Sequence, residues 1–317
     1  MQDNLYMNKD SKIFVAGHKG MVGSAIMRKL KNKGFTNIVF DERKYLDLTD
    51  QTSVRTFFWE EKPEYVFLAA AKVGGIKYNA TVPGDFIYEN LMIQSNVINE
   101  CKNHNVKKLC FLGSACIYPK VTKMPIKEEY LLTGPLEPSN EPYAIAKIAG
   151  LKMCQYYRQQ YNLKSVIAMP ANLYGPNDNF KVEQGHVIPG LIKKFVDAEK
   201  NNIDTVEVWG DGSATREFLH VDDLADAVVY LMKNKLNTFN FLNIGSDYEI
   251  SIKELAHLIK ELTDYKGNIK WLVDMPNGTP RRVMDNSQLF GLGWKPKINF
   301  VEGLFETIKW YKNDSNI

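Results

Sequence analysis

The sequence predicts an α/β protein built on a Rossmann-type doubly wound parallel sheet, followed by a smaller C-terminal domain. Three observations indicate this fold class. Short β-rich runs alternate with longer helical stretches through the first half of the chain, which is the rhythm of a parallel sheet with helices on both faces. A glycine-rich turn directly follows the first β-rich run. After Pro170 the alternation loosens into shorter elements separated by prolines and glycines.

The elements of the first half follow from residue type and segment length. Runs rich in β-branched and aromatic residues predict strands at 12–16, 37–40, 65–69, 108–112 and 165–169. Parallel strands need long crossover connections, and the stretches between these runs are helical in character. Helices are therefore expected near 21–33, 51–61, 86–103 and 144–161.

The first strand ends in the turn Gly17-His-Lys-Gly20-Met-Val-Gly23, which opens a helical stretch. This is the arrangement in which a pyrophosphate rests on a helix N-terminus. Gly17 permits the tight turn, Gly20 lets the backbone approach the phosphates, and Gly23 lets helix and strand pack closely. The spacing differs from the Gly-x-Gly-x-x-Gly of many dehydrogenases, so the turn alone is a weak indication of a dinucleotide site.

The chain is expected to divide near residue 175. Residues 1–175 would form the dinucleotide-binding domain, with a segment near 218–245 returning to it, and residues 176–317 would mainly form a substrate-binding domain. In the second half, Ser251 with Glu254 three residues later is a capping-box pattern, which predicts the start of a helix.

Bulk properties exclude several classes of protein. The 317 residues are 44% hydrophobic and 24% charged, as is usual for a globular protein. A net charge of +3 is too balanced for a nucleic-acid binder. No apolar run approaches a membrane span, and the first residues lack the apolar core of a signal peptide, so a cytoplasmic location is expected. The four cysteines show no CxxC spacing, which suggests neither zinc nor a disulfide framework.

Tyr143 and Lys147 lie four residues apart in a predicted helix, so their side chains share one face. An ammonium beside a phenol is expected to lower the pKa of the phenol, which makes it a usable proton donor near neutral pH. Ser114, upstream in Leu-Gly-Ser-Ala-Cys, could hold a carbonyl oxygen against that phenol. These three side chains suit transfer of a proton to or from an oxygen while hydride is transferred to or from the carbon that bears it. An ordinary helix face is the alternative, and the glycine turn argues against it.

The choice of nicotinamide cofactor is left open by the residues that follow the second strand. An acidic residue there usually reads the ribose hydroxyls of NAD, whereas a nearby arginine accommodates the phosphate of NADP. The chain offers Asp41 and Glu42, followed by Arg43, and Lys19 adds a cation from the glycine turn. A solvated charged turn is the competing interpretation of the two acidic residues.

Together these motifs resemble the extended short-chain dehydrogenase/reductases and, more narrowly, the GDP-L-fucose synthase family. The resemblance covers nearly the whole chain, from the glycine turn to Gly-Thr-Pro-Arg-Arg282. Its most specific segments are Gly113-Ser-Ala-Cys-Ile-Tyr-Pro119, Asn140-Glu-Pro-Tyr-Ala-Ile-Ala-Lys147, His186-Val-Ile-Pro189 and Arg216-Glu-Phe-Leu-His-Val-Asp-Asp223.

The resemblance implies a bifunctional enzyme that converts GDP-4-keto-6-deoxy-D-mannose to GDP-L-fucose. Cys116 and His186 would exchange protons at C3 and C5, which the C4 ketone acidifies, and NADPH would reduce C4 while Tyr143 protonates the oxygen. A lone cysteine is more commonly a small buried hydrophobe. However, Cys116 lies two residues from Ser114, and side chains at this spacing on a strand share a face. The predicted catalytic residues are Ser114, Cys116, Tyr143, Lys147 and His186.

The resemblance also assigns the binding residues, and it implies NADP(H) as cofactor with no metal. Lys194 could equally belong to a solvated helix face. The expected contacts of the nucleotide-sugar diphosphate and guanosine are Lys194, Trp209, Arg216, Asn277 and Arg282. The expected cofactor contacts are Gly17, His18, Lys19, Gly20, Met21, Val22, Gly23, Arg43, Asp47, Leu48, Ala70, Leu112, Gly113, Tyr143, Lys147, Pro170, Asn172, Leu173 and His186.

Two alternatives stay open. The same reductase could act on another GDP-4-keto sugar, either a heptose or a 3,6-dideoxy sugar leading to GDP-colitose. A regulatory protein that binds NADP without turnover is also conceivable, although such proteins tend to lose the catalytic Tyr or Lys. By analogy with related enzymes, a homodimer is expected through helices 86–103 and 144–161.

Overall fold

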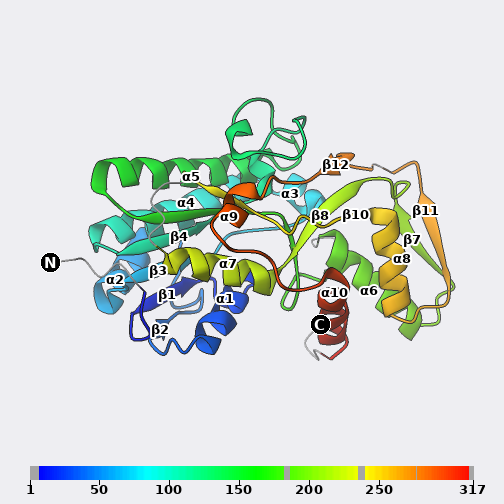
Figure 1. Cartoon of the computed structure of the whole chain (residues 1–317), viewed down its shortest axis with the longest axis horizontal. Helices are drawn as coiled ribbons and strands as arrows, with labels where there is room; N and C mark the ends of the chain where they lie inside the picture. Colours follow the sequence, from blue (N-terminus) through cyan, green and yellow to red (C-terminus); the bar gives the residue numbers. More distant parts are fainter. Residues whose placement is uncertain (1–6, 182–185, 235–239, 276, 314–317) are drawn as a thin grey trace.

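The computed structural model describes residues 7–313, apart from 182–185, 235–239 and 276. A six-stranded parallel sheet lies at the centre of the larger part of the molecule (Figure 1), in the order β2-β1-β3-β4-β5-β9. The five strands expected in the first half are confirmed, with ends that differ by no more than one residue. The strands are β1 (Ile13–Ala16), β2 (Ile38–Val39), β3 (Tyr65–Leu68), β4 (Lys108–Leu112), β5 (Ser165–Pro170) and β9 (Leu242–Ile244).

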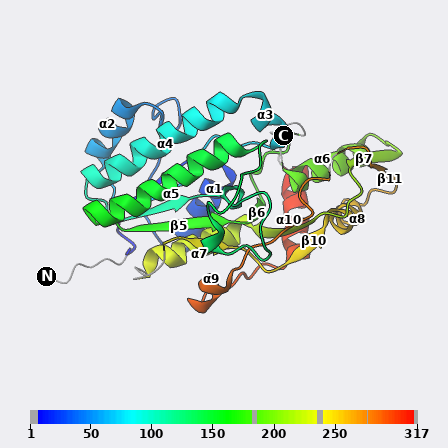
Figure 2. The same cartoon turned by 90° about the horizontal axis from the view of Figure 1, so that it is seen from above.

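Helices cover both faces of this sheet, as a doubly wound fold requires. On one face α1 packs against α7, and on the other α4 and α5 lie side by side with α2 next to α4 (Figure 2). The direction of chain travel reverses between β1 and β3, so the carboxyl ends of these strands form the switch point at which such folds bind ligands. The helices are α1 (Met21–Asn32), α2 (Gln51–Glu61), α4 (Pro83–Asn103), α5 (Glu141–Tyr161) and α7 (Val221–Lys233).

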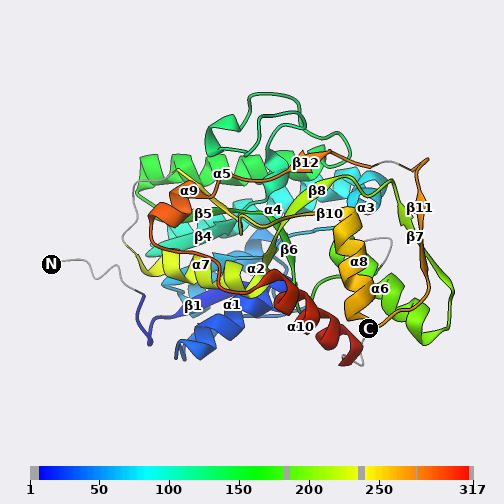
Figure 3. The ribbon, with the colours of Figure 1, turned by 45° about the vertical axis from the view of Figure 1, so that its right-hand side comes forward.

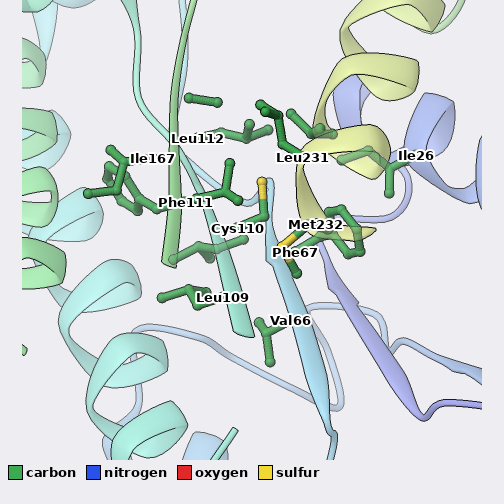
Figure 4. Close-up of a cluster of buried hydrophobic side chains, with 14 of the residues drawn as sticks. Ile26, Val66, Phe67, Leu109, Cys110, Phe111, Leu112, Ile167, Leu231 and Met232 are labelled. Atoms are coloured by element: carbon green, nitrogen blue, oxygen red, sulfur yellow. The ribbon is translucent and has the colours of Figure 1, made fainter. Parts of the chain in front are cut away.

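The core lies between the sheet and its helices. Every residue of β1, β3, β4 and β5 is buried, as expected for parallel strands covered on both faces. Figure 4 shows Ile26 of α1 and Leu231 and Met232 of α7 beside Phe67 of β3 and Cys110 of β4. Both α4 and α5 begin three residues earlier than expected, because a proline in the first turn is compatible with a helix start.

The second part of the molecule has its own hydrophobic cluster, which includes Phe195, Leu255 and Leu304. Figure 3 shows its helices α6 and α8 beside the pair β7–β11, with α10 on the other side of α8. Ser251 and Glu254 form the predicted capping box at the start of α8, so that prediction is confirmed. The elements are β6 (Asn172–Tyr174), α6 (Val187–Lys200), β7 (Thr205–Trp209), β8 (Thr215–His220), β10 (Glu249–Ser251), α8 (Ile252–Leu262), β11 (Asn268–Leu272), β12 (Arg281–Arg282) and α10 (Phe300–Asn313).

Shorter elements complete the chain. Strand β8 pairs with β6, β10 and β12, which joins the second part to the end of β5. Within the described ranges, no helix combines the length and the apolar character needed to cross a lipid bilayer. The remaining helical segments are α3 (Ile76–Thr81), α9 (Ser287–Gly291) and the 3-10 turns η1 (Ala115–Ile117) and η2 (Glu128–Tyr130).

Candidate active site

The glycine turn has the geometry of a phosphate cradle. Gly17 has a φ of +84°, and a Cβ there would lie 2.8 Å from the backbone of Ala70. A Cβ on Gly23 would come 2.0 Å from the carbonyl oxygen of Gly17. Gly20 caps α1 without a side-chain hydrogen bond, the first turn carries no acidic residue, and the nearest atom to a Cβ on Gly20 is 3.5 Å away. The amide end of α1 therefore fits an anionic pyrophosphate, because its backbone donors and dipole are not used by a side-chain cap.

Two of the predicted phosphate-binding cations lie beside this turn, and both are paired with carboxylates. The Lys19 ammonium lies 2.6 Å from Glu42, and the Arg43 guanidinium lies 3.4 Å from Glu89 of α4. The ring of His18 contacts Phe40, with 4.5 Å between ring centroids. A bound 2′-phosphate would have to compete with these carboxylates for the two cations.

The predicted adenine-side turn is held by its own hydrogen bonds. The carboxylate of Asp47 accepts from the backbone N–H and the hydroxyl of Thr49, which lowers the pKa of Asp47. The carbonyl oxygen of Leu48 accepts from the side-chain amide of Asn96 on α4. The turn is therefore fixed before any ligand arrives.

Tyr143 and Lys147 project from the first turns of α5 toward the carboxyl end of β4. Lys147 is 4% exposed, and its ammonium donates to the carbonyl oxygen of Leu112 at 2.9 Å. That ammonium lies 5.7 Å from the centroid of the Tyr143 ring, so the two side chains share a helix face as predicted. Burial lowers the pKa of Lys147 to about 8, against an opposing influence from Cys116.

The pKa of the Tyr143 phenol is not lowered in this structure, contrary to the prediction from the Tyr-Lys spacing. Burial raises the pKa of Tyr143 well above its ordinary value, and the neighbouring Cys116 raises it further. The physical reason is that the ammonium is engaged by the carbonyl of Leu112 while the phenol loses hydration.

The strand spacing applied to Ser114 and Cys116 does not hold, because neither residue lies in a strand. Strand β4 ends at Leu112, and residues Ala115–Ile117 form the 3-10 turn η1, with Ser114 as its N-cap. The two side chains nevertheless meet, because the Ser114 hydroxyl accepts from the Cys116 backbone N–H at 3.4 Å and also hydrogen-bonds the thiol. The Ser114 cap and the 3-10 turn therefore bring the hydroxyl and the thiol together, as the strand spacing was expected to do.

Cys116 is the partly exposed cysteine, whereas Cys101, Cys110 and Cys154 are buried. Burial raises the pKa of the Cys116 thiol, but hydrogen bonds from Ser114 and Asn140 and the charges of Arg282 and Lys147 act in the opposite direction. The thiolate is the reactive form of cysteine, so this set of donors and cations favours chemistry at the sulfur.

His186 stands apart from these side chains. It occupies the N-cap position of α6, its side chain is exposed, and desolvation by surrounding protein lowers its pKa. Among the described residues, no hydrogen bond or ion pair joins it to Cys116, Tyr143 or Lys147. The structure therefore brings thiol, phenol and ammonium together and leaves the imidazole without a contact to them.

The five predicted substrate residues all lie in the second part of the molecule. Lys194 of α6 donates to the carbonyl of Glu207 at 2.8 Å, and Trp209 at the end of β7 is 54% exposed. Asn277 is engaged through its side-chain oxygen, which accepts from the backbone N–H of Asp211 at 2.8 Å.

The two predicted substrate arginines are neighbours on paired strands. Arg216 of β8 is in register with Arg282 of β12, and burial together with the nearby charge of Arg282 lowers the pKa of Arg216. Arg216 donates to the carbonyl of Thr215 at 2.7 Å. Arg282 instead donates to the carbonyls of residues 115, 118 and 119, beside Cys116.

Sequence reasoning missed two side chains at this site. Asn140 contacts the Cys116 thiol, and its side-chain oxygen accepts from Asn79 of α3 at 2.9 Å. Glu89 is bound by Lys72 at 2.6 Å as well as by Arg43. Asn140 was detectable as a polar residue directly before the helix that carries Tyr143, but nothing local to Glu89 pointed to the cofactor turn.

The fold and this site define a class of protein, a dinucleotide-dependent enzyme with a Tyr-Lys pair and a neighbouring thiol. The chain belongs to the NAD dependent epimerase/dehydratase family, whose sequence model matches residues 13–245. Within it, the resemblance predicted from the motifs is confirmed by curated relatives. GDP-L-fucose synthase 1 of Arabidopsis thaliana is 55% identical over 310 residues, 98% of this chain and 96% of the relative. GDP-L-fucose synthase of Escherichia coli (strain K12) is 46% identical, over 95% of this chain and 96% of the relative.

The names of other relatives refer to other GDP sugars. GDP-L-colitose synthase of Yersinia pseudotuberculosis is 36% identical, over 96% of this chain and 99% of the relative. Among solved structures, MlghC, a GDP-mannoheptose C4 reductase from Campylobacter jejuni with NADP bound, matches with a TM-score of 0.87 and 40% identity, over 97% of this chain and 100% of that one.

Proposed function

We propose that this protein is a GDP-L-fucose synthase, which converts GDP-4-keto-6-deoxy-D-mannose to GDP-L-fucose by epimerisation at C3 and C5 and NADPH-dependent reduction at C4. The observation that carries the proposal is the nearly full-length similarity to GDP-L-fucose synthases. The meeting of Cys116, Tyr143 and Lys147 at the end of β4 supports it.

NADP(H) would lie with its pyrophosphate on the amide end of α1, and the NADP-bound structural relative supports this choice. Lys19 and Arg43 would take the 2′-phosphate, the Asp47–Leu48 turn would flank the adenine, and Lys147 would hold the nicotinamide ribose. When bound, the reduced cofactor supplies hydride for C4.

In the epimerisation, the Cys116 thiolate would remove a proton from the carbon next to the C4 ketone. The C–H bond breaks, an S–H bond forms, and the electron pair moves to the C4 oxygen as an enolate. The hydroxyls of Ser114 and Tyr143 would stabilise that oxygen. Protonated His186 would return a proton to the opposite face of the ring, which inverts the configuration and leaves a neutral imidazole.

In the reduction, Tyr143 would transfer its phenolic proton to the C4 oxygen while Ser114 orients the carbonyl. The high pKa of Tyr143 in its buried site keeps the phenol protonated before the transfer. Electrostatic stabilisation by the Lys147 charge would then favour the phenolate that remains.

The proposal is tested with purified protein, GDP-4-keto-6-deoxy-D-mannose and NADPH. We expect oxidation of NADPH and GDP-L-fucose as the product, identified by NMR. In D₂O with cofactor withheld, deuterium should enter both C3 and C5. Absence of turnover with this sugar would contradict the assignment.

The second candidate is the same reductase acting on another GDP-4-keto sugar, and the colitose synthase and the heptose reductase among the relatives favour it. A 3,6-dideoxy sugar needs epimerisation only at C5. Deuterium at C5 alone, or turnover only with a heptose substrate, would select this candidate.

We further propose that residues 1–175, with a returning segment near 218–245, bind the cofactor and that 176–317 mainly bind the nucleotide sugar. The two separate hydrophobic clusters support this division. We also propose a cytoplasmic homodimer. Helices α4 and α5 pack side by side and expose Tyr88, Ile145 and Tyr156, which supports a dimer contact. The four free cysteines are consistent with a reducing compartment, and light scattering measures the oligomeric state.

A further inference from the structure

The turn that carries Cys116 is held by a side chain from far along the sequence. The Arg282 guanidinium donates to the carbonyl oxygens of Ala115 at 3.0 Å, Tyr118 at 3.1 Å and Pro119 at 3.4 Å. A planar guanidinium presents donors in a fixed fork, so one side chain can hold several carbonyls of a turn in one arrangement.

The neighbouring arginine does something different. Successive side chains on a strand point to opposite faces, and Arg281 accordingly pairs with Glu249 through two hydrogen bonds, of 2.7 and 2.5 Å. Among the described residues, no carboxylate lies within ion-pair distance of Arg282. The Arg282 charge therefore remains available to other groups near the turn.

Cys116 is the group that this charge reaches. The charges that face the thiol are those of Arg282 and Lys147, and its hydrogen-bonding neighbours are Ser114 and Asn140. Arg282 itself is faced by Cys116, Tyr118, Glu137 and Arg216, and its partial burial strengthens its effect on the sulfur.

The other end of the turn is fixed independently. Tyr118 is fully buried, and its hydroxyl donates to the side-chain oxygen of Asn243 at 2.5 Å. Loss of Arg282 would thus release the segment between Ser114 and Tyr118, which contains the thiol, without detaching the rest of the loop.

We propose that Arg282 is a positioning residue for Cys116, which holds the turn through three main-chain carbonyls and keeps a positive charge beside the sulfur. This role differs from the diphosphate contact that sequence reasoning assigned to Arg282. This role of Arg282 rests on the proposed function in one respect, which is that Cys116 acts as the base of the epimerisation.

The test measures the reactivity of the thiol in the full-length protein without sugar or cofactor. Iodoacetamide alkylates the thiolate. Cys116 is partly exposed and the other three cysteines are buried, so mass spectrometry of the peptide that contains Cys116 gives its own alkylation rate. The rate is measured against pH for the unaltered protein, Arg282→Gln, Arg282→Lys and the matched control Arg281→Gln.

We expect Arg282→Gln to be alkylated about threefold to tenfold more slowly near neutral pH, with its rate curve displaced to higher pH, since one unit of pKa changes the thiolate fraction tenfold. Arg282→Lys keeps the positive charge but not the planar arrangement of donors, so its rate curve should lie between the curves of the unaltered protein and Arg282→Gln. Arg281→Gln should follow the unaltered protein. If Arg282→Gln does not fold, slower alkylation of Arg282→Lys than of the unaltered protein and Arg281→Gln supports the proposal, and equal rates overturn it.

A second measurement separates this role from a diphosphate contact. Calorimetric titration with GDP reports substrate-side binding. Weaker GDP binding by Arg282→Gln with an unchanged alkylation curve would overturn the proposal. Alkylation needs no keto sugar. An alkylation result that overturns the role of Arg282 would therefore not contradict the proposed function, and a protein that fails to turn over the keto sugar would not change the alkylation result.

Discussion

Raising the pH is expected to drive the two half-reactions in opposite directions. Burial lowers the pKa of Lys147 to about 8, whereas burial raises the pKa of the Cys116 thiol above its ordinary value of 9.0. Lys147 loses its proton and its charge as the pH rises through 8. Cys116 gains reactivity over the same range, because its thiolate fraction keeps growing until the pH passes its own pKa.

The size of the effect on each rate follows from these two pKa values. Between about pH 7 and 9 the thiolate fraction rises by a factor that approaches 100, because a group titrating above this range changes tenfold per unit. Over the same interval the charged fraction of Lys147 falls from roughly nine-tenths to roughly one-tenth. Removal of a proton from C3 or C5 by the thiolate should therefore accelerate by tens of fold, and deuterium that the thiol itself returns to the same carbon reports this step without His186. C4 reduction should slow by about tenfold.

Two assays give the profiles separately. NMR follows deuterium entry into the keto sugar in D₂O without cofactor, and absorbance follows NADPH oxidation with saturating sugar. In Lys147→Arg the charge persists, so the alkaline loss of the reduction rate should disappear, whereas Lys152→Arg on the same helix should retain it. Parallel profiles, or a reduction rate that is constant to about pH 9.5, would refute this reasoning.

Three further predictions concern single side chains. Tyr143→Phe should lower C4 reduction by about 10² to 10⁴, the usual contribution of a positioned proton donor, while deuterium exchange continues; intact reduction would show that another group donates the proton. Cys116→Ala should abolish deuterium exchange at C3 and C5 but leave NADPH binding unchanged in a fluorescence titration, and persistent exchange would exclude the thiol as the base. Glu42→Gln frees Lys19 from its ion pair and should tighten NADPH binding by about twofold to fivefold at low salt. Asp41→Asn is its control, because the Asp41 carboxylate accepts from the backbone N–H of Glu42, and equal effects of the two changes would contradict the role of the pair.

The parts of the site that sequence predicted are those whose geometry is local. The glycine turn follows from three spaced glycines after a β-rich run, and the structure gives Gly17 and Gly23 no room for a side chain. Tyr143 and Lys147 share a face because the helical repeat places residues four apart together. The capping box at Ser251 is likewise a short-range pattern.

Two predictions were wrong because a local pattern was used where the surrounding structure decides. The first applied a strand pattern beyond the end of the strand, and the second neglected burial. The spacing rule of a strand was applied to Ser114 and Cys116, but the strand ends at Leu112 and a capped 3-10 turn follows. The pKa of Tyr143 was expected to fall, yet burial raises it, since the depth of a side chain depends on everything that packs over it.

By itself, the sequence determined the first five strands of the sheet, the glycine turn and the shared face of Tyr143 and Lys147, because each is encoded within a few consecutive residues or one helical turn. The sixth strand and the order of the strands came from the structure. Only the tertiary structure decided which groups surround the sulfur. Arg282 reaches Ala115 across 167 positions of sequence, and Glu89 meets Arg43 across 46. Such contacts depend on how whole strands and helices pack, and no local spacing specifies them.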